Sequence, residues 1–319
     1  MGGGKGAGGR EGKGRRAGDF QAAIMPDSRT ACERFLPHLP RGGKSPMLAA
    51  MDMGTVSLAH LFWLALVQGV TEFLPISSSG HLQLVSHWFA GASHGATLDL
   101  ALHLGSLMAV LVYFRAQLLR LARGAWAGCR RQPTAASRDA SWLIAASLPI
   151  LALAGLLFAF GWHDALRQPE LVAWATIIFA LPLYAADRWG GAERQWRALS
   201  WKSALFVGAA QSLALMPGAS RAGLALTAAR ALGCARRDAV EMSMLLAVPV
   251  ILALSAGGAL NLALAGDALA WRAAGLGFAL AGLFAFAAIH AMLWLSARLT
   301  LLPFVLYRLA LGAGLLYLA

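Results

Sequence analysis

The stretch QGVTEFLPISSSGH, Gln68 to His81, interrupts an apolar run that begins near Val56. Its proline, glycines and three serines break a pattern that would otherwise continue as a transmembrane helix. A second stretch, QSLALMPGASRAG from Gln211 to Gly223, breaks another apolar run in the same way. Lipid cannot satisfy free backbone N–H and C=O groups, so each break must be buried in protein or line a wet cavity. The two breaks are therefore the parts of the sequence in which functional residues are expected.

The two breaks also resemble each other. Each runs from a glutamine, Gln68 or Gln211, to a Pro-x-x-Ser sequence, Pro75 to Ser78 or Pro217 to Ser220, and the glutamines are 143 positions apart. Paired interruptions at corresponding positions are typical of structural repeats, often inverted, that meet near the bilayer midplane. Inverted repeats with two re-entrant segments are therefore predicted, and chance similarity of two short Ser/Pro stretches is the alternative.

The composition excludes an ordinary water-soluble domain. Of 319 residues, 58% are hydrophobic and only 13% are charged, and the mean hydropathy is +0.61. Long stretches nearly free of charge match the roughly 20 apolar residues that span a bilayer. The predicted fold is an all-α polytopic integral membrane protein with about eight helices. They are expected near residues 56–67, 98–114, 141–162, 171–186, 203–215, 240–265, 271–296 and 301–318.

The charge pattern predicts the orientation in the membrane. A net charge of +12 would suggest nucleic-acid binding in a soluble protein, but here the basic residues lie mainly in the leader and between apolar segments. The Arg-rich connections from Arg115 to Arg138 and from Asp187 to Lys202 are expected in the cytoplasm, and the link from His163 to Glu170 outside. A multi-pass protein of the bacterial inner membrane is predicted, with no nucleic-acid partner.

Residues 1–46 form a Gly-, Arg- and Lys-rich leader without hydrophobic periodicity or the apolar core of a signal peptide. It is predicted to be disordered, with two alternatives: a basic arm attracted to anionic lipid headgroups, or a start site assigned too far upstream. Residues 53–319 are predicted to form a single transmembrane domain. The cysteines lack CxxC spacing, so neither a disulfide framework nor a zinc site is expected; they are Cys32, Cys129 and Cys234.

Ionisable and hydroxyl side chains gather in the two breaks. The first holds Glu72, the serines 77–79 and His81, and the second holds Ser220 and Arg221. A charged side chain at the centre of a membrane helix costs at least about 2.5 to 3.5 kcal/mol, so such residues are functional candidates. A Gly- and Ser-rich turn followed by a helix N-terminus suits a phosphate group, and an arginine fork grips phosphoryl oxygens. Serine, arginine and histidine together could hydrolyse a phosphoanhydride.

The segments QGVTEFLPISSSGHL and PGASRAG resemble the two signature motifs of the undecaprenyl-diphosphate phosphatase family, also called the bacitracin-resistance protein family. The resemblance covers nearly everything after Val56, including LDLALHLGSLMAVLVYFR at 98–115, LPLYAADR at 181–188 and MSMLLAVPVIL at 242–252. It implies a fold with two re-entrant segments, a site open to the periplasm, dependence on a divalent cation such as Mg²⁺ or Ca²⁺, and hydrolysis of undecaprenyl diphosphate to the monophosphate. That reaction recycles the lipid carrier of peptidoglycan synthesis and confers bacitracin resistance.

The resemblance also assigns roles. Glu72, Ser78, His81 and Arg221 fall on functional positions of the family, and phosphate binding is expected from the neighbouring residues Ser77, Ser79, Gly80, Gly218 and Ser220. Gln68 stands where several members have a second glutamate, so a metal site with two carboxylates is not expected. Glu72 and the neutral amide oxygen of Gln68 are the expected metal ligands. Ser78 would attack the terminal phosphorus or position a water while His81 shuttles the proton, although His81 could itself attack or activate a water.

Other polar residues receive ordinary interpretations. Asp99 and Glu241 are expected to compensate helix N-termini, and Arg308 could snorkel to the interface. Trp196 is expected among the interfacial anchors, and core histidines are expected at 87, 94, 103 and 290. The rival function is a transporter or lipid flippase, because paired broken helices also occur in secondary transporters; a structural membrane protein is a distant third. The expected partners are a polyprenyl diphosphate, membrane lipids and a second copy in a homodimer.

Overall fold

A computed structural model describes residues 57–89, 95–160, 168–191, 193–265 and 268–318. Within these residues all regular secondary structure is helical, apart from one isolated β-bridge between Arg194 and Cys234. The predicted all-α class is confirmed. The leader, residues 1–46, lies outside the described residues.

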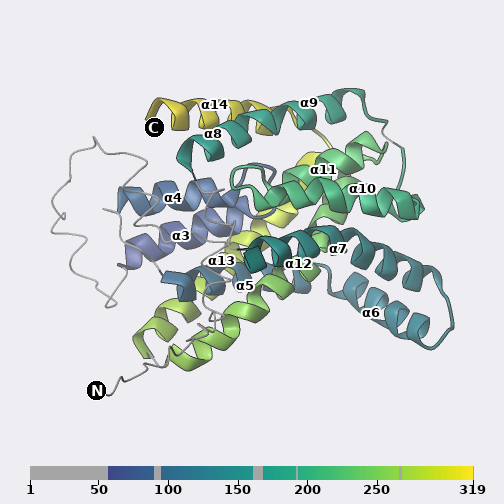
Figure 1. Ribbon diagram of the computed structural model, residues 1–319, viewed down its shortest axis with the longest axis horizontal. Helices are drawn as coiled ribbons and strands as arrows, with labels where there is room; N and C mark the ends of the chain where they lie inside the picture. Colours follow the sequence, from purple (N-terminus) through teal and green to yellow (C-terminus); the bar gives the residue numbers. More distant parts are fainter. Residues whose placement is uncertain (1–56, 90–94, 161–167, 192, 266–267, 319) are drawn as a thin grey trace, which may run out of the picture.

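The helices follow one another in the order given in Figure 1. They are α3 (Leu58–Thr71), α4 (Ser78–Trp88), α5 (Gly95–Tyr113), α6 (Arg115–Cys129), α7 (Ala135–Phe160), α8 (Pro169–Ile178), α9 (Ala180–Trp189), the 3₁₀ turn η2 (Trp196–Ala198), α10 (Trp201–Ser212), the 3₁₀ turn η3 (Leu213–Leu215), α11 (Arg221–Ala231), α12 (Arg236–Ala265), α13 (Ala268–Ser296) and α14 (Leu302–Leu318).

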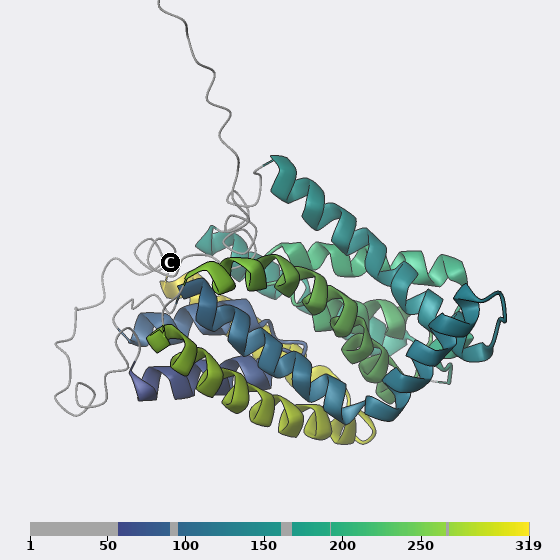
Figure 2. The ribbon, with the colours of Figure 1, turned by 90° about the horizontal axis from the view of Figure 1, so that it is seen from below.

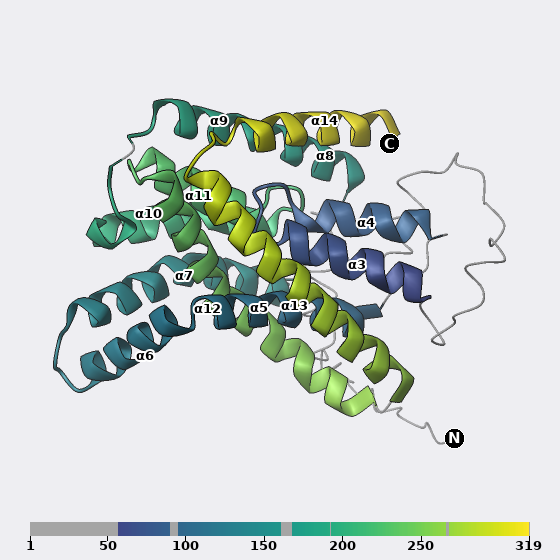
Figure 3. The same ribbon diagram turned by 180° about the vertical axis from the view of Figure 1, so that it is seen from behind.

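The helices pack in groups around the two breaks. Helices α3 and α4 lie side by side, and α14 runs along α8 and α9 at one edge of the molecule (Figures 1 and 3). Figure 2 shows α5 between α12 and α13, and α13 also packs on α3. The break between α3 and α4 and the break between α10 and α11 therefore lie inside the helix assembly, as the need to satisfy their backbone groups requires.

Glycines set the closest helix contacts. A Cβ at Gly105 of α5 would lie 2.2 Å from the carbonyl oxygen of Phe278 on α13. A Cβ at Gly312 of α14 would lie 2.4 Å from a side-chain carbon of Ile177 on α8. Small residues let membrane helices approach closely and gain dispersion contacts, because lipid offers no hydrophobic driving force for association. These two contacts hold α13 closely against α5 and α14 closely against α8.

Several helices are long and apolar enough to cross a membrane. Within the described residues, three spans meet this test, Ala135–Leu157, Glu170–Trp189 and Trp271–Ser296. The pair Thr97–Tyr113 and Arg115–Cys129 would make a fourth, although its two helices are bent by 85°. The predicted multi-pass membrane protein is confirmed at this level.

The helix α6 corrects one expectation. The Arg-rich stretch from Arg115 to Arg138 was expected to be a connection, but most of it is helical. Leu121 and Gly124 are buried, and a Cβ at Gly124 would clash with Ala136 of α7. The opposite face exposes Leu119 and Trp126. The helix forms because its leucines and alanines supply an apolar face that packs on α7. The number of arginines alone did not predict this face.

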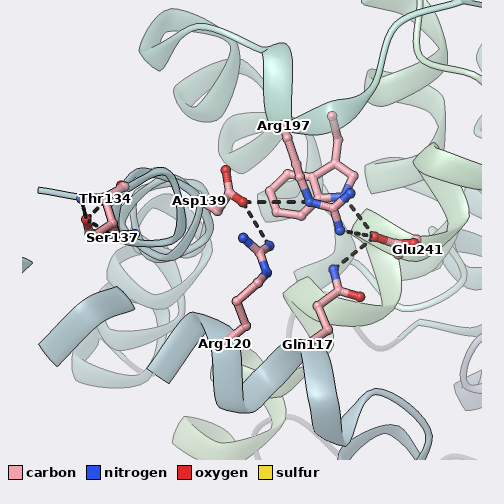
Figure 4. Close-up of polar contacts among 8 residues, drawn as sticks. Gln117, Arg120, Thr134, Ser137, Asp139, Arg197 and Glu241 are labelled. Carbon is pink, nitrogen blue, oxygen red and sulfur yellow. Dashed lines mark hydrogen bonds and ion pairs between the residues drawn. The ribbon is translucent and has the colours of Figure 1, made fainter. Parts of the chain in front are cut away.

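A network of polar contacts attaches α6 and α7 to the rest of the molecule (Figure 4). Asp139 of α7 pairs with Arg120 of α6 at 2.8 Å and with Arg197 of η2 at 3.7 Å. Glu241 of α12 accepts hydrogen bonds from three side chains, those of Gln117, Trp196 and Arg197. Glu241 therefore links helices rather than compensating a helix end alone. Trp196 is fully buried, so its assignment as an interfacial anchor was wrong.

Two cysteines provide a test of orientation. Cys129 is exposed at the end of α6, whereas Cys234 is buried and its burial raises the pKa of its thiol to about 11. Because only the thiolate reacts, Cys234 stays almost fully protonated and inert at neutral pH. In a Cys32→Ser variant, a membrane-impermeant maleimide is expected to label Cys129 in inside-out vesicles and to label Cys234 only after denaturation. Labelling of Cys129 from outside intact spheroplasts would reverse the predicted orientation.

Candidate active site

The first break begins where α3 ends. Glu72 caps this helix, its N–H donating to the carbonyl of Gln68 at 3.1 Å. The chain then turns through Pro75 and reaches Ser77, which has a left-handed φ of 71°. Helix α4 starts at the next residue, Ser78. A left-handed conformation costs a residue other than glycine about 1–2 kcal/mol, so the fold holds Ser77 in place at a cost.

The second break has the same local form. Gly218 has a φ of 92°, and a Cβ there would lie 2.3 Å from the carbonyl oxygen of Val172. Ser220 has a φ of 69° and caps α11 by accepting a hydrogen bond from the N–H of Gly223. Helix α11 starts at Arg221. By backbone conformation Ser220 therefore corresponds to Ser77. The match of the two Pro-x-x-Ser sequences would instead pair Ser220 with Ser78, the next residue.

Glu72 is the point at which the two breaks meet. Its Oε1 lies 3.1 Å from Nη2 of Arg221, and the two side chains are only 9% and 12% exposed. Its Oε2 accepts hydrogen bonds from Oγ of Ser78 and from Nε2 of Gln68, both at 3.1 Å. A carboxylate that accepts from a serine hydroxyl can take its proton, and the neighbouring guanidinium can hold a phosphoryl oxygen. The sequence predicts this convergence, and the structure shows it.

His81 lies elsewhere in the first break. Its Nδ1 is 2.6 Å from the carbonyl oxygen of Ser77, and its Nε2 is 2.6 Å from the hydroxyl of Tyr307 on α14. The hydroxyl of Ser78, its expected partner, is bonded to Glu72 instead. The site therefore contains two separate hydrogen-bonded pairs, Ser78 with Glu72 and His81 with Tyr307.

The remaining predicted residues shape the breaks. The hydroxyls of Ser77 and Ser79 are hydrogen-bonded to each other at 3.2 Å. Gly80 is buried in the first turn of α4, where a Cβ would meet Val172 at 4.0 Å. Their expected contacts with phosphate remain predictions.

His103, expected among the core histidines, lies close to the site. From α5 its Nε2 reaches to 3.8 Å from Oε2 of Glu72. Its Nδ1 lies 2.9 Å from the carbonyl oxygen of Asp99, which can only accept, so Nδ1 carries a proton. An ionisable side chain inside an apolar helix is itself a sign of function, and this was the available signal.

Arg308 of α14 was also missed. Its side chain is fully buried, so it does not snorkel to the interface. It donates to five backbone carbonyl oxygens, those of Pro75 and Ala219 at 3.2 and 3.1 Å, of Gly218 at 3.1 Å, and of Thr176 and Ala175 at 3.1 and 3.5 Å. One guanidinium thus ties both breaks to α8.

The oxygen ligands available to a divalent cation are few. The described residues contain no group of three or more His, Cys, Asp or Glu side chains that could hold a metal ion. They do place the carboxylate of Glu72 beside Gln68, whose Oε1 is buried without a hydrogen-bond partner. Mg²⁺ in phosphate-processing sites commonly takes one or two carboxylates together with substrate oxygens. The donors fit a cation that obtains most of its other ligands from a bound phosphate group.

Comparison with known proteins finds a matching family and similar sequences. The family model described as "Bacitracin resistance protein BacA" matches residues 61–314. The undecaprenyl-diphosphatase of Maricaulis maris is 45% identical over 264 residues, 82% of this chain and 98% of the relative. The undecaprenyl-diphosphatase of Nitrosococcus oceani is 42% identical over 261 residues, 81% of this chain and 98% of the relative. The chain belongs to the bacitracin resistance protein BacA family.

Proposed function

We propose that the chain hydrolyses undecaprenyl diphosphate to undecaprenyl phosphate and inorganic phosphate, the activity for which its relatives are named. The observation that carries the proposal is the buried carboxylate of Glu72, which accepts the hydroxyl of Ser78 and pairs with Arg221 from the second break. The guanidinium of Arg221 lies at this carboxylate and at the N-terminus of α11, where it can bind a phosphoryl oxygen. The activity recycles the lipid carrier and thereby confers bacitracin resistance.

The reaction transfers the terminal phosphoryl group. Arg221 and the N-terminus of α11 bind its oxygens and stabilise the charge that develops on them. Glu72 takes the proton of the attacking oxygen, which belongs to Ser78 or to a water that Ser78 positions. The bond between the terminal phosphorus and the bridging oxygen breaks, and the bridging oxygen remains on the lipid monophosphate. His81 gives its proton to that leaving oxygen. If the attacking oxygen is that of Ser78, a water then attacks the phosphoserine, which releases inorganic phosphate and restores the serine hydroxyl.

A divalent cation, Mg²⁺ or Ca²⁺, would be held by the carboxylate of Glu72 and the amide oxygen of Gln68. When bound it neutralises charge on the phosphoryl oxygens. The unpartnered Oε1 of Gln68 supports this assignment. A neutral amide replaces a second carboxylate here, so the protein alone should hold the cation weakly.

We also propose that the two breaks are re-entrant segments of inverted repeats within a single domain, residues 53–319. Two correspondences support this. Ser77 and Ser220 share a left-handed conformation directly before α4 and α11. Gln68 and Gln211 are fully buried, and each has an amide oxygen without a hydrogen-bond partner in the described part of the chain. The proposed site opens to the periplasmic side of the inner membrane, and a homodimer is the proposed assembly.

The direct test is phosphate release from a long-chain polyprenyl diphosphate by the purified protein in detergent, with and without EDTA. Ser78→Ala is expected to lower the rate by about a hundredfold or more, because it removes the attacking or positioning hydroxyl. Ser203→Ala on α10, which removes a hydroxyl from an exposed serine pair, should match the wild-type rate. EDTA should suppress release if the cation assignment holds.

The second candidate function is transport, because paired broken helices also occur in secondary transporters. The assay in detergent separates the two functions, because hydrolysis needs no gradient across a membrane and transport does. A folded wild-type protein that releases no phosphate under any metal condition would reject hydrolysis and favour the transporter.

A further inference from the structure

Helix α14 places two adjacent polar residues, Tyr307 and Arg308, against the site. Neither belongs to the two breaks, and α14 begins at Leu302, well beyond the end of the second break at Gly223. We propose that Tyr307 is a positioning residue that orients the imidazole of His81 and restores its proton between turnovers, while Arg308 holds α14 in register with both breaks. This inference rests on the proposed function.

Hydrogen bonding fixes which nitrogen of His81 can react. The carbonyl oxygen of Ser77 can only accept, so Nδ1 of His81, 2.6 Å away, carries a proton. Protons must therefore enter and leave at Nε2. That nitrogen lies 2.6 Å from the hydroxyl of Tyr307, which can both donate and accept. Tyr307 is thus the side chain bonded to the reactive nitrogen.

The rings of His81 and Tyr307 also stack. Their centroids are 5.6 Å apart and their planes differ by 6°. Tyr307 is 44% exposed, whereas His81 is partly buried. After His81 has given its proton to the leaving oxygen, Tyr307 can pass its hydroxyl proton to Nε2 and take one from water. The phenol is regenerated, and the hydroxide that this leaves is neutralised by the proton that Glu72 took from the attacking oxygen and releases to solvent.

Arg308 explains why Tyr307 stays in place. Its bonds to the carbonyl oxygens of Pro75 and of Gly218 and Ala219 connect α14 directly to both breaks. No ion pair to Arg308 occurs among the described residues, so backbone carbonyl dipoles compensate its charge. A shift of α14 along its axis would break these bonds and leave a guanidinium buried without partners. The position of Tyr307 relative to His81 is therefore set by its neighbour.

The test uses Tyr307→Phe, which keeps the stacked ring and removes the hydroxyl. We expect kcat for phosphate release to fall by about tenfold to a hundredfold, with KM within about twofold and an unchanged thermal unfolding midpoint. Tyr184→Phe is the matched control. Tyr184 is 40% exposed on α9 and its ring packs on Trp189, away from the site, so this variant should behave as the wild type.

A double-mutant cycle separates positioning from general stabilisation. If Tyr307 acts through His81, then His81→Ala combined with Tyr307→Phe should be no slower than His81→Ala alone. Losses that multiply in the double variant, or a Tyr307→Phe enzyme as fast as the wild type, would overturn the inference. Absence of phosphate release from the wild type would instead reject the proposed function, and this inference with it.

Discussion

Replacing Glu72 by glutamine is expected to lower phosphate release from a polyprenyl diphosphate by about a thousandfold or more. The carboxylate has two contacts that an amide cannot reproduce together. Its Oε2 accepts from the hydroxyl of Ser78, and its Oε1 pairs with Arg221 at 3.1 Å. Glutamine keeps the size of the side chain but cannot take the proton of the attacking oxygen. The substitution therefore removes chemistry with little change in packing.

The control for Glu72→Gln is Glu170→Gln, which alters an exposed carboxylate in the first turn of α8. It should retain the wild-type rate. The amount of Glu72→Gln protein in the membrane and its thermal unfolding midpoint must also be compared, because the change leaves Arg221 without its carboxylate partner. A folded Glu72→Gln protein that retains a tenth of the activity would exclude Glu72 as the group that accepts the proton.

Replacing Arg221 by alanine is expected to cut turnover by about a thousandfold, within the range found when a transition-state arginine is removed from phosphoryl transfer. Arg221 stands at the N-terminus of α11, where the helix dipole and the guanidinium act on the same oxygens. Its side chain bridges Glu72 and the carbonyl of Ser243. The loss should appear in kcat rather than in the amount of protein in the membrane.

Two further variants sharpen this result. Arg221→Lys keeps the positive charge but loses the planar fork, so it should recover only part of the rate. Arg188→Ala removes an exposed arginine from the last turn of α9 and should leave turnover unchanged. Near-normal turnover of Arg221→Ala would show that another group binds the phosphoryl oxygens.

The local sequence was sufficient to locate the two breaks, but not to predict all the side chains that surround them. Gln68, Glu72 and Ser78 lie within eleven consecutive positions, and helix spacing and a tight turn bring them together without distant help. Arg221 carried its own signal, because it directly follows a Pro-Gly-Ala-Ser turn. The local sequence did not show which groups surround His81. Its two ring nitrogens are hydrogen-bonded to the carbonyl of Ser77 and to the hydroxyl of Tyr307, and not to Ser78.

Composition and local pattern were sufficient to predict the class of the protein, the positions of most long helices and the two places where the helical pattern fails. These properties depend on composition and on neighbours along the chain, which hydropathy and turn residues report directly. The packing of the helices was needed to show that His103 lies near Glu72, that Arg308 bonds to both breaks and that Tyr307 is hydrogen-bonded to His81. These contacts depend on the rotation and register of packed helices, to which each residue adds a small energy. These contacts therefore cannot be predicted from the pattern of residues along a single sequence.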